Sequence, residues 1–210
     1  MYKKGFTIIE VVVVFLLILG VTFLTLPKNL ETTKKAKLIS QWSRKYADIQ
    51  YVFSVMKAQK DSELREKING TKNHNDKEEI FLETVKPYLR ITTGIKIPYT
   101  QRYMNDIEVT ATGKYYFNKF YNTALNEIVG LKLINADCEG EQVCAIMAFD
   151  INGSSPPNTW GYDIFGINIL RQNIVPFGSG INHDELKDDC SKIGSGVYCS
   201  YYYLMGGRFD

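Results

Sequence analysis

A nearly unbroken apolar run close to the N-terminus dominates the hydrophobic pattern of the chain. It extends from Phe6 to Leu26, follows Lys3 and Lys4, and contains one charged residue, Glu10. About 20 helical residues, each rising about 1.5 Å, cross the roughly 30 Å hydrocarbon core of a bilayer. The pattern therefore predicts a single-pass membrane helix with its positive N-terminal flank in the cytoplasm.

The apolar pattern changes from continuous to periodic after Pro27. Apolar residues then recur at spacings of three and four, as on one face of an amphipathic helix: Ile39, Trp42, Tyr46, Ile49, Phe53 and Met56. Proline removes one helical hydrogen bond, so we expect Pro27 to bend the helix without ending it. We predict one helix from about Phe6 to about Gln59, whose second half packs on a sheet.

A polar segment, 61–76, follows this helix, and within it Asn69-Gly70 and the run 73–76 predict turns. Asn75 and Glu78 have the spacing of a capping box at the start of a second helix. That helix would turn four apolar residues inward, namely Ile80, Phe81, Val85 and Leu89. Pro87 is expected to shorten it.

Apolar runs in the second half of the chain predict β-strands. The expected strands are 107–112, 115–117, 128–134, 143–149, 164–170 and 197–204. An antiparallel meander laid across the long helix would give an α+β fold.

The charge pattern adds a basic face to the second half of the long helix: Lys28, Lys34, Lys35, Lys37, Arg44 and Lys45. This face is either solvated or in contact with anionic lipid head groups or acidic surfaces. One candidate acidic surface contains Asp184, Glu185, Asp188 and Asp189. The net charge of +2 argues against nucleic acid as a partner, because such binding is typical of strongly basic chains.

Four cysteines lie in the last third of the chain: Cys138, Cys144, Cys190 and Cys199. On the outer side of a membrane, an even number of cysteines indicates disulfides. We favour local pairing, Cys138 with Cys144 and Cys190 with Cys199, among three connectivities. A four-thiolate zinc site is the alternative, although neither pair has the usual C-x2–4-C spacing.

Glu10 is unusual within an apolar run, because a carboxylate in a membrane helix costs about 2.5–3.5 kcal/mol. No Lys, Arg or His lies within the run to neutralise it. Cleavage between Gly5 and Phe6 would release an α-amino group. The amine of a neighbouring copy is the better candidate, since Glu10 cannot easily reach its own.

The residues Gly5-Phe6-Thr7-Ile8-Ile9-Glu10, followed by the apolar run, resemble the N-terminus of the type IV pilin and pseudopilin family. The resemblance implies cleavage after Gly5 by a prepilin peptidase and methylation of Phe6. It also implies assembly with other pilin or pseudopilin subunits, in which Glu10 neutralises the Phe6 amine of an adjacent copy. Pro27 lies where family members commonly have a helix-kinking proline.

The resemblance also implies a location and a pilin-like domain map. The protein would sit in the bacterial inner membrane beside an assembly platform and then enter a periplasmic or extracellular filament. The expected parts are a leader (1–5), a membrane and polymerisation helix (6–27), an amphipathic spine (28–60), a variable helical and loop region (61–105) and an antiparallel sheet domain with a disulfide-stapled end (106–210).

Two other readings use the same N-terminal pattern. An ordinary signal peptide would need a shorter apolar region and a small-residue cleavage site, which the sequence lacks. A membrane-anchored extracytoplasmic binding domain would use the same leader without polymerising.

The segment 150–165 resembles a loop that recurs in minor pilin-like proteins, and it gathers hard oxygen ligands: Asp150, Asn152, Asn158 and Asp163. These residues are candidate ligands for calcium, because calcium takes six to eight oxygens in irregular geometry, and some pseudopilins hold calcium in a loop of the sheet. We favour the other reading, in which the same side chains hydrogen-bond the local backbone and Gly153 takes a positive φ.

Candidate catalysts are scarce. The two histidines, His74 and His183, lie in polar segments, and no nucleophile-elbow, zinc-protease or phosphate-loop motif occurs. We therefore expect a structural protein and not an enzyme.

Overall fold

The computed structural model describes residues 8–94 and 99–208, and for 23–32, 93 and 94 it describes the backbone alone. The chain divides into two compact units, Met1–Lys37 and Leu38–Asp210. Within the described residues, the element order is one long helix, a second helix, six strands and two short helices. The first helix begins in one unit and ends in the other, and each unit is described by itself.

The long helix α1 (Ile8–Asn69) runs for 62 residues and continues through Pro27, as predicted. It also continues about ten residues past the predicted end near Gln59, so that end was wrong, and it stops at the predicted turn residues Asn69-Gly70. Ion pairs one helical turn apart support this part, Arg65 with Asp61 and Lys67 with Glu63, each at 2.7 Å.

The start of α1, residues 8–21, is apolar apart from Glu10 and Gly20 and is exposed. Its large side chains are exposed from Ile8 (85%) to Val21 (61%). Within the residues that the structure describes, no helix has both the length and the apolar character needed to cross a membrane. The predicted span begins at Phe6, outside the described residues, and its membrane role is not confirmed.

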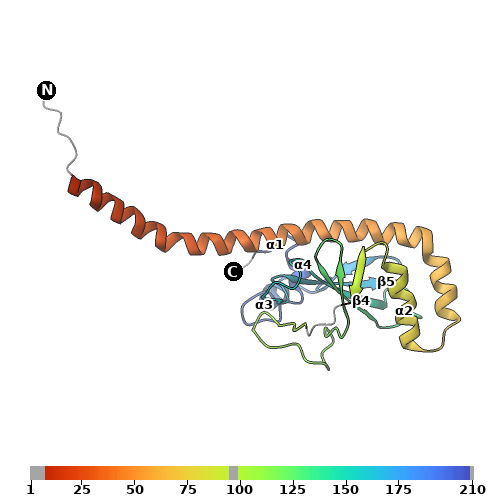
Figure 1. Cartoon of the computed structure of the whole chain (residues 1–210). Helices are drawn as coiled ribbons and strands as arrows, with labels where there is room; N and C mark the ends of the chain where they lie inside the picture. The colour runs from red at the N-terminus through yellow and green to blue at the C-terminus, as the bar shows by residue number, and fades with distance from the viewer. Residues whose placement is uncertain (1–7, 95–98, 209–210) are drawn as a thin grey trace. The chain divides into compact units, whose positions relative to one another are not determined.

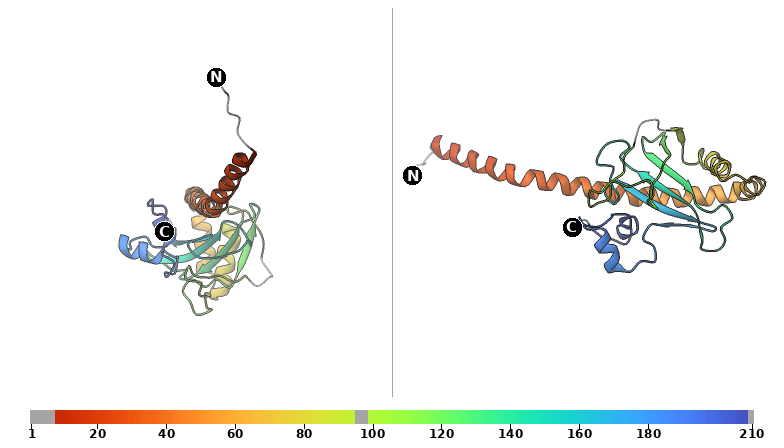
Figure 2. Two further views of the ribbon diagram at one scale, coloured as in Figure 1. Left: turned by 90° about the vertical axis from the view of Figure 1, so that its left-hand side faces the viewer. Right: turned by 90° about the horizontal axis from the view of Figure 1, so that it is seen from below.

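The six strands form one antiparallel sheet in sequence order, β1-β2-β3-β4-β5-β6, which is the predicted meander (Figures 1 and 2). Its strands are β1 (Ile91–Gly94), β2 (Phe120–Thr123), β3 (Ile128–Leu133), β4 (Val143–Asp150), β5 (Ile164–Leu170) and β6 (Ile174–Pro176). The predictions 128–134, 143–149 and 164–170 match β3, β4 and β5. The short strands β1, β2 and β6 were missed.

Three predicted strands are absent from the described chain. Apolar and polar residues alternate in 107–112, but the segment forms only an isolated β-bridge, between Glu108 and Arg102. In the segment 115–117, Tyr115 belongs to a turn, and Tyr116 and Phe117 have no regular secondary structure. The segment 197–204 contains α4 (Cys199–Tyr202), because its backbone N–H groups bond four residues back, as from Tyr203 N to Cys199 O at 3.1 Å.

The second helix, α2 (His74–Val85), ends before Pro87 as predicted. Its N-cap is Asn73, whose side chain accepts from Asn75 N at 3.0 Å, so the predicted capping by Asn75 was wrong. Phe81 and Val85 are buried, as expected. A further helix that the sequence pattern missed, α3 (His183–Asp189), is capped by Asn182.

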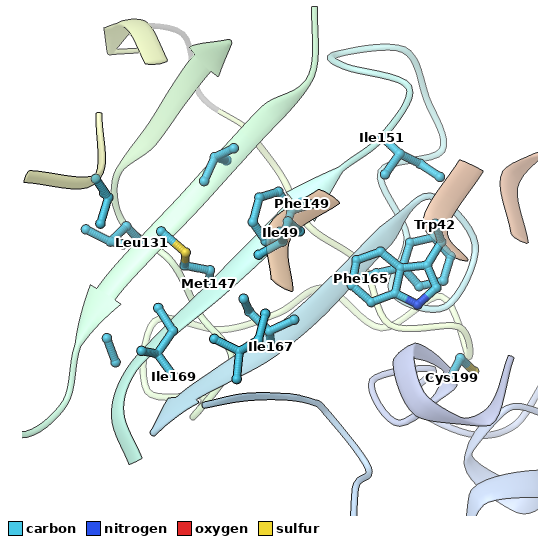
Figure 3. Close-up of a cluster of buried hydrophobic side chains, with 14 of the residues drawn as sticks. Trp42, Ile49, Leu131, Met147, Phe149, Ile151, Phe165, Ile167, Ile169 and Cys199 are labelled. Atoms are coloured by element: carbon cyan, nitrogen blue, oxygen red, sulfur yellow. The ribbon is translucent and has the colours of Figure 1, made fainter. Parts of the chain in front are cut away.

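The second half of α1 packs along one face of the sheet (Figure 1). Trp42 is fully buried, with its ring stacked on Phe165 at 5.0 Å between centroids (Figure 3). Its indole N–H donates to Ser200 O in α4 at 2.8 Å. The predicted apolar face of this helix is therefore confirmed as the core.

The sheet carries a core on each face, and β4 shows why its sequence is continuously apolar. Met147 and Phe149 face the α1 cluster, whereas Ile146 and Ala148 face a second cluster. That second cluster includes Phe117, Trp160 and Phe177 from the connecting segments. A strand covered on both faces loses the alternation of polar and apolar residues.

Candidate functional site

The residues of the predicted processing site lie only partly within the described chain. Gly5 and Phe6 lie outside the described residues. Glu10 lies in the first turn of α1 with an exposed side chain. Pro27 lies within α1, and its side chain is outside the described residues.

Both predicted disulfides are present. Cys138 pairs with Cys144 across the β3–β4 connection, and Cys190 pairs with Cys199 between α3 and α4. Their Cα atoms are 5.2 and 5.3 Å apart, within the usual range for a disulfide. Because all four sulfurs are used in two separate bridges, the alternative of a four-thiolate zinc site was wrong.

The basic face predicted on α1 is not uniform. Lys45 turns back to the domain, where it forms an ion pair with Glu127, and both side chains are largely buried. Lys34, Lys37 and Arg44 are exposed. These three residues keep both predicted readings open, a solvated face or contact with an anionic surface.

The four predicted calcium ligands converge between β4 and β5. Asp150 ends β4, and Asp163 directly precedes β5, so the sheet brings their carboxylates together. Asn152 Nδ2 donates to Asp163 Oδ2 at 3.2 Å, and the backbone N–H of Asn158 donates to the same oxygen at 3.0 Å. After the amide of Asn158 is turned over, its nitrogen lies 3.2 Å from Asp150 Oδ2.

The loop is tightly built around these carboxylates. Thr159 N donates to Asp163 Oδ1 at 2.6 Å, and Asn152 N donates to Asp150 Oδ1 at 3.2 Å. Gly153 has φ +73°, as predicted, and a Cβ there would lie 2.5 Å from Asn126 O. Backbone geometry and close approach therefore both require glycine at this position.

Tyr99 completes the cluster, and the sequence pattern did not identify it. Its hydroxyl donates to Asp150 Oδ2 from a segment 51 residues earlier in the chain. No local motif marks this tyrosine, since only the folded sheet brings the two residues together.

Both carboxyl groups are buried, with Asp150 2% and Asp163 0% exposed. Burial, and then the nearby charge of Asp163, raises the pKa of Asp150 to about 8. Burial also raises the pKa of Asp163 to about 6, against the lowering effect of its backbone donors at Thr159 and Asn158. Among the described residues neither acid has a Lys or Arg partner, so the cluster favours holding a proton at neutral pH.

The contacts can be compared with what calcium requires. Each carboxylate oxygen already accepts a hydrogen bond from a protein donor. Among the oxygens of these four predicted ligands, only Asn152 Oδ1 is buried without a hydrogen-bond partner in the described chain. These contacts match the favoured reading of local hydrogen bonding, and the calcium site stays a prediction. If calcium bound, Asp150, Asp163 and Asn152 Oδ1 would hold it, and the ion would supply a counter-charge to the two acids.

Searches against family models, curated protein sequences and solved structures found no match to this chain.

Proposed function

We propose that the chain is a structural subunit of a type IV pilus or type II secretion pseudopilus. It would assemble through its N-terminal helix after a prepilin peptidase cleaves between Gly5 and Phe6. The observation that carries this proposal is the apolar first part of α1, which contains one acid, Glu10, and leads in the same helix into the spine of the sheet domain.

The exposed apolar residues of α1 support burial against a bilayer or other helices. Residues such as Phe15 (65% exposed) and Leu17 (64%) present their side chains to the surroundings of the isolated chain. Full burial of one large apolar side chain is worth about 1.5–3 kcal/mol. Removing a row of such side chains from water gives a large driving force for membrane insertion followed by helix packing in a filament.

Glu10 supplies the pairing that orders such packing. In a low-dielectric helix bundle an unpaired carboxylate is costly, whereas a carboxylate beside an ammonium group is stabilised. The Phe6 amine of an adjacent copy provides that ammonium group in the proposed filament. Each incoming subunit is then held in register by one charge pair.

Processing is the first step to test. In a host with a working prepilin peptidase, intact-mass measurement of the purified chain should show loss of Met1 to Gly5 and a methylated Phe6. A chain that keeps Met1 in such a host would have no free Phe6 amine, and the proposed pairing would be impossible.

Assembly is tested separately with Glu10→Val. Because the variant keeps the cleavage site, we expect normal processing but at least a tenfold loss from the sheared filament fraction, equivalent to about 1.4 kcal/mol or more per subunit contact. Glu66→Val, at an exposed position of the same helix, is the matched control and should assemble normally. Equal assembly of both variants would instead favour an anchored binding domain that does not polymerise.

A further inference from the structure

A hollow of about 540 Å³ lies between the last turns of α1 and the sheet. One wall is the connection closed by the Cys138–Cys144 disulfide, and another is the β5–β6 turn at Arg171 and Gln172. Pockets for small molecules typically measure about 300–1,000 Å³. The hollow is therefore large enough for a small organic ligand.

The floor of this hollow is apolar. Met56 and Phe81 come from the two helices, and Leu133 and Ile169 from the sheet, each less than 9% exposed. Polar groups that lose water against such a surface are destabilised, whereas hydrocarbon gains about 25 cal/mol per Å² buried. The floor thus suits the apolar part of a ligand, whereas the walls, which are about as polar as they are apolar, suit a polar end.

The rim is charged, and most of its charges are already used. Asp61 pairs with Arg65 at 2.7 Å, and Lys60 pairs with Glu63 at 2.6 Å. Asp137 pairs with Lys77 at 3.4 Å. The opposite charges within each of these pairs neutralise each other, so this part of the rim offers little net charge to a ligand.

Two cations that form no ion pair in the described chain line the hollow near the β5–β6 turn, Lys57 from α1 and Arg171 from the turn itself. Lys57 Nζ donates to the backbone oxygen of Gln172 at 3.2 Å and also to the side-chain oxygen of Gln172, which places it beside the residue that follows Arg171. In the described part of the chain Arg171 has no ion-pair partner. The one other rim charge without an ion pair there, Glu139, belongs to a different wall, the disulfide-closed connection. The turn therefore presents a positive end next to the apolar floor.

We propose that this hollow binds a long-chain fatty acid, with the alkyl chain on the apolar floor and the carboxylate at Lys57 and Arg171. The guanidinium of Arg171 matches a carboxylate in charge and in planar geometry. This inference does not depend on filament assembly, because every residue it uses lies in the Leu38–Asp210 unit.

The test uses the full chain in phosphatidylcholine vesicles with a photoreactive diazirine fatty acid, followed by peptide mapping. We expect labelling of peptides that contain residues 53–64 and 133–140. The matching diazirine fatty alcohol should label them several-fold less, because it lacks the carboxylate that Arg171 recognises. Arg171→Gln should lower labelling by the acid about tenfold, since a charge-assisted hydrogen bond is lost.

Arg208→Gln, at an exposed arginine outside the hollow, is the matched control and should label like the parent chain. Ala136→Trp, which fills the hollow, should abolish labelling there. If that variant misfolds, the comparison of Arg171→Gln with the parent chain still tests the proposal. The proposal is overturned if acid and alcohol label the hollow equally, if Arg171→Gln changes nothing, or if label reaches only the N-terminal apolar part of α1.

Discussion

At the scale of residues, a few buried side chains stabilise the β4–β5 loop and the core. Asp150 and Asp163 are buried acids whose surroundings supply N–H and O–H donors and no basic partner among the described residues. Trp42 joins α1 to both the sheet and α4 through its ring and its indole N–H. The stability of the domain should therefore respond sharply to changes at these positions.

The buried acids predict an unusual pH dependence. The folded pKa of Asp150, about 8, and that of Asp163, about 6, both exceed the ordinary value of 3.8. The folded state then binds more protons than the unfolded state, so this contribution is complete below about pH 4 and is lost as pH rises through 6 and 8. Thermal unfolding across pH 5 to 9 should show a falling midpoint, and Asp150→Asn should flatten the fall. A midpoint that rises over this range would contradict a pKa raised by burial.

Calcium has a separate expected outcome. Because protein donors already occupy the carboxylate oxygens, we expect added Ca²⁺ to leave the thermal midpoint unchanged and to give no heat in titration calorimetry. A midpoint increase that Asp150→Ala and Asp163→Ala both abolish would instead establish the predicted calcium site.

Trp42 should be the most sensitive position on the spine helix. Trp42→Ala removes a fully buried ring and leaves Ser200 O without its donor, so we expect a loss of about 3–5 kcal/mol in the free energy of unfolding. Tyr51→Ala, at a 72% exposed position of the same helix, should change it by less than about 0.5 kcal/mol. Denaturant unfolding of the two variants gives the comparison.

At the scale of elements, the two disulfides have different surroundings. Cys138–Cys144 closes a surface connection, and Cys144 is partly exposed. Cys190–Cys199 joins α3 to α4 within the core, and Cys199 is fully buried. The second bridge therefore holds α4, which is also tied to the sheet because the backbone N–H of Gly166 in β5 donates to Ser200 Oγ at 2.9 Å.

Removing each bridge should expose this difference. The double change Cys190→Ser with Cys199→Ser should cost about 2–5 kcal/mol, because it both frees the chain and leaves polar atoms in the core. The double change Cys138→Ser with Cys144→Ser should cost less. In a graded reductant series, mass mapping should show the Cys138–Cys144 bridge reduced first, because reductant reaches an exposed sulfur more easily. An equal loss of unfolding free energy in the two double variants would contradict a larger contribution from the Cys190–Cys199 bridge.

At the scale of the whole molecule, the single helix α1 runs through both compact units, and its apolar residues have different surroundings in each. The domain closes two cores on the faces of the sheet. The helix start leaves its apolar residues exposed. A chain of this kind gains by burying the helix elsewhere, and the proposed filament is one way to do so.

The sequence by itself determined the long helix, its apolar face and the three central strands, and it favoured the two disulfide pairings among three connectivities that the structure then decided. These features follow from the spacing of residues that are close together in the sequence, and this spacing does not depend on the rest of the fold. It also identified the loop residues Asp150 and Asp163, because both lie in one short polar segment whose oxygen-bearing side chains can be recognised without knowing the fold.

Only the tertiary structure decided the features that depend on distant partners. The alternating segment 107–112 forms no strand, because no neighbouring strand in the described chain pairs with it. The apolar C-terminal segment became α4, because the core beside Trp42 and the Cys190–Cys199 bridge can take a helical turn there. Tyr99 joined the acidic loop for the same reason: hydrogen bonds between residues far apart in sequence exist only after the sheet has formed.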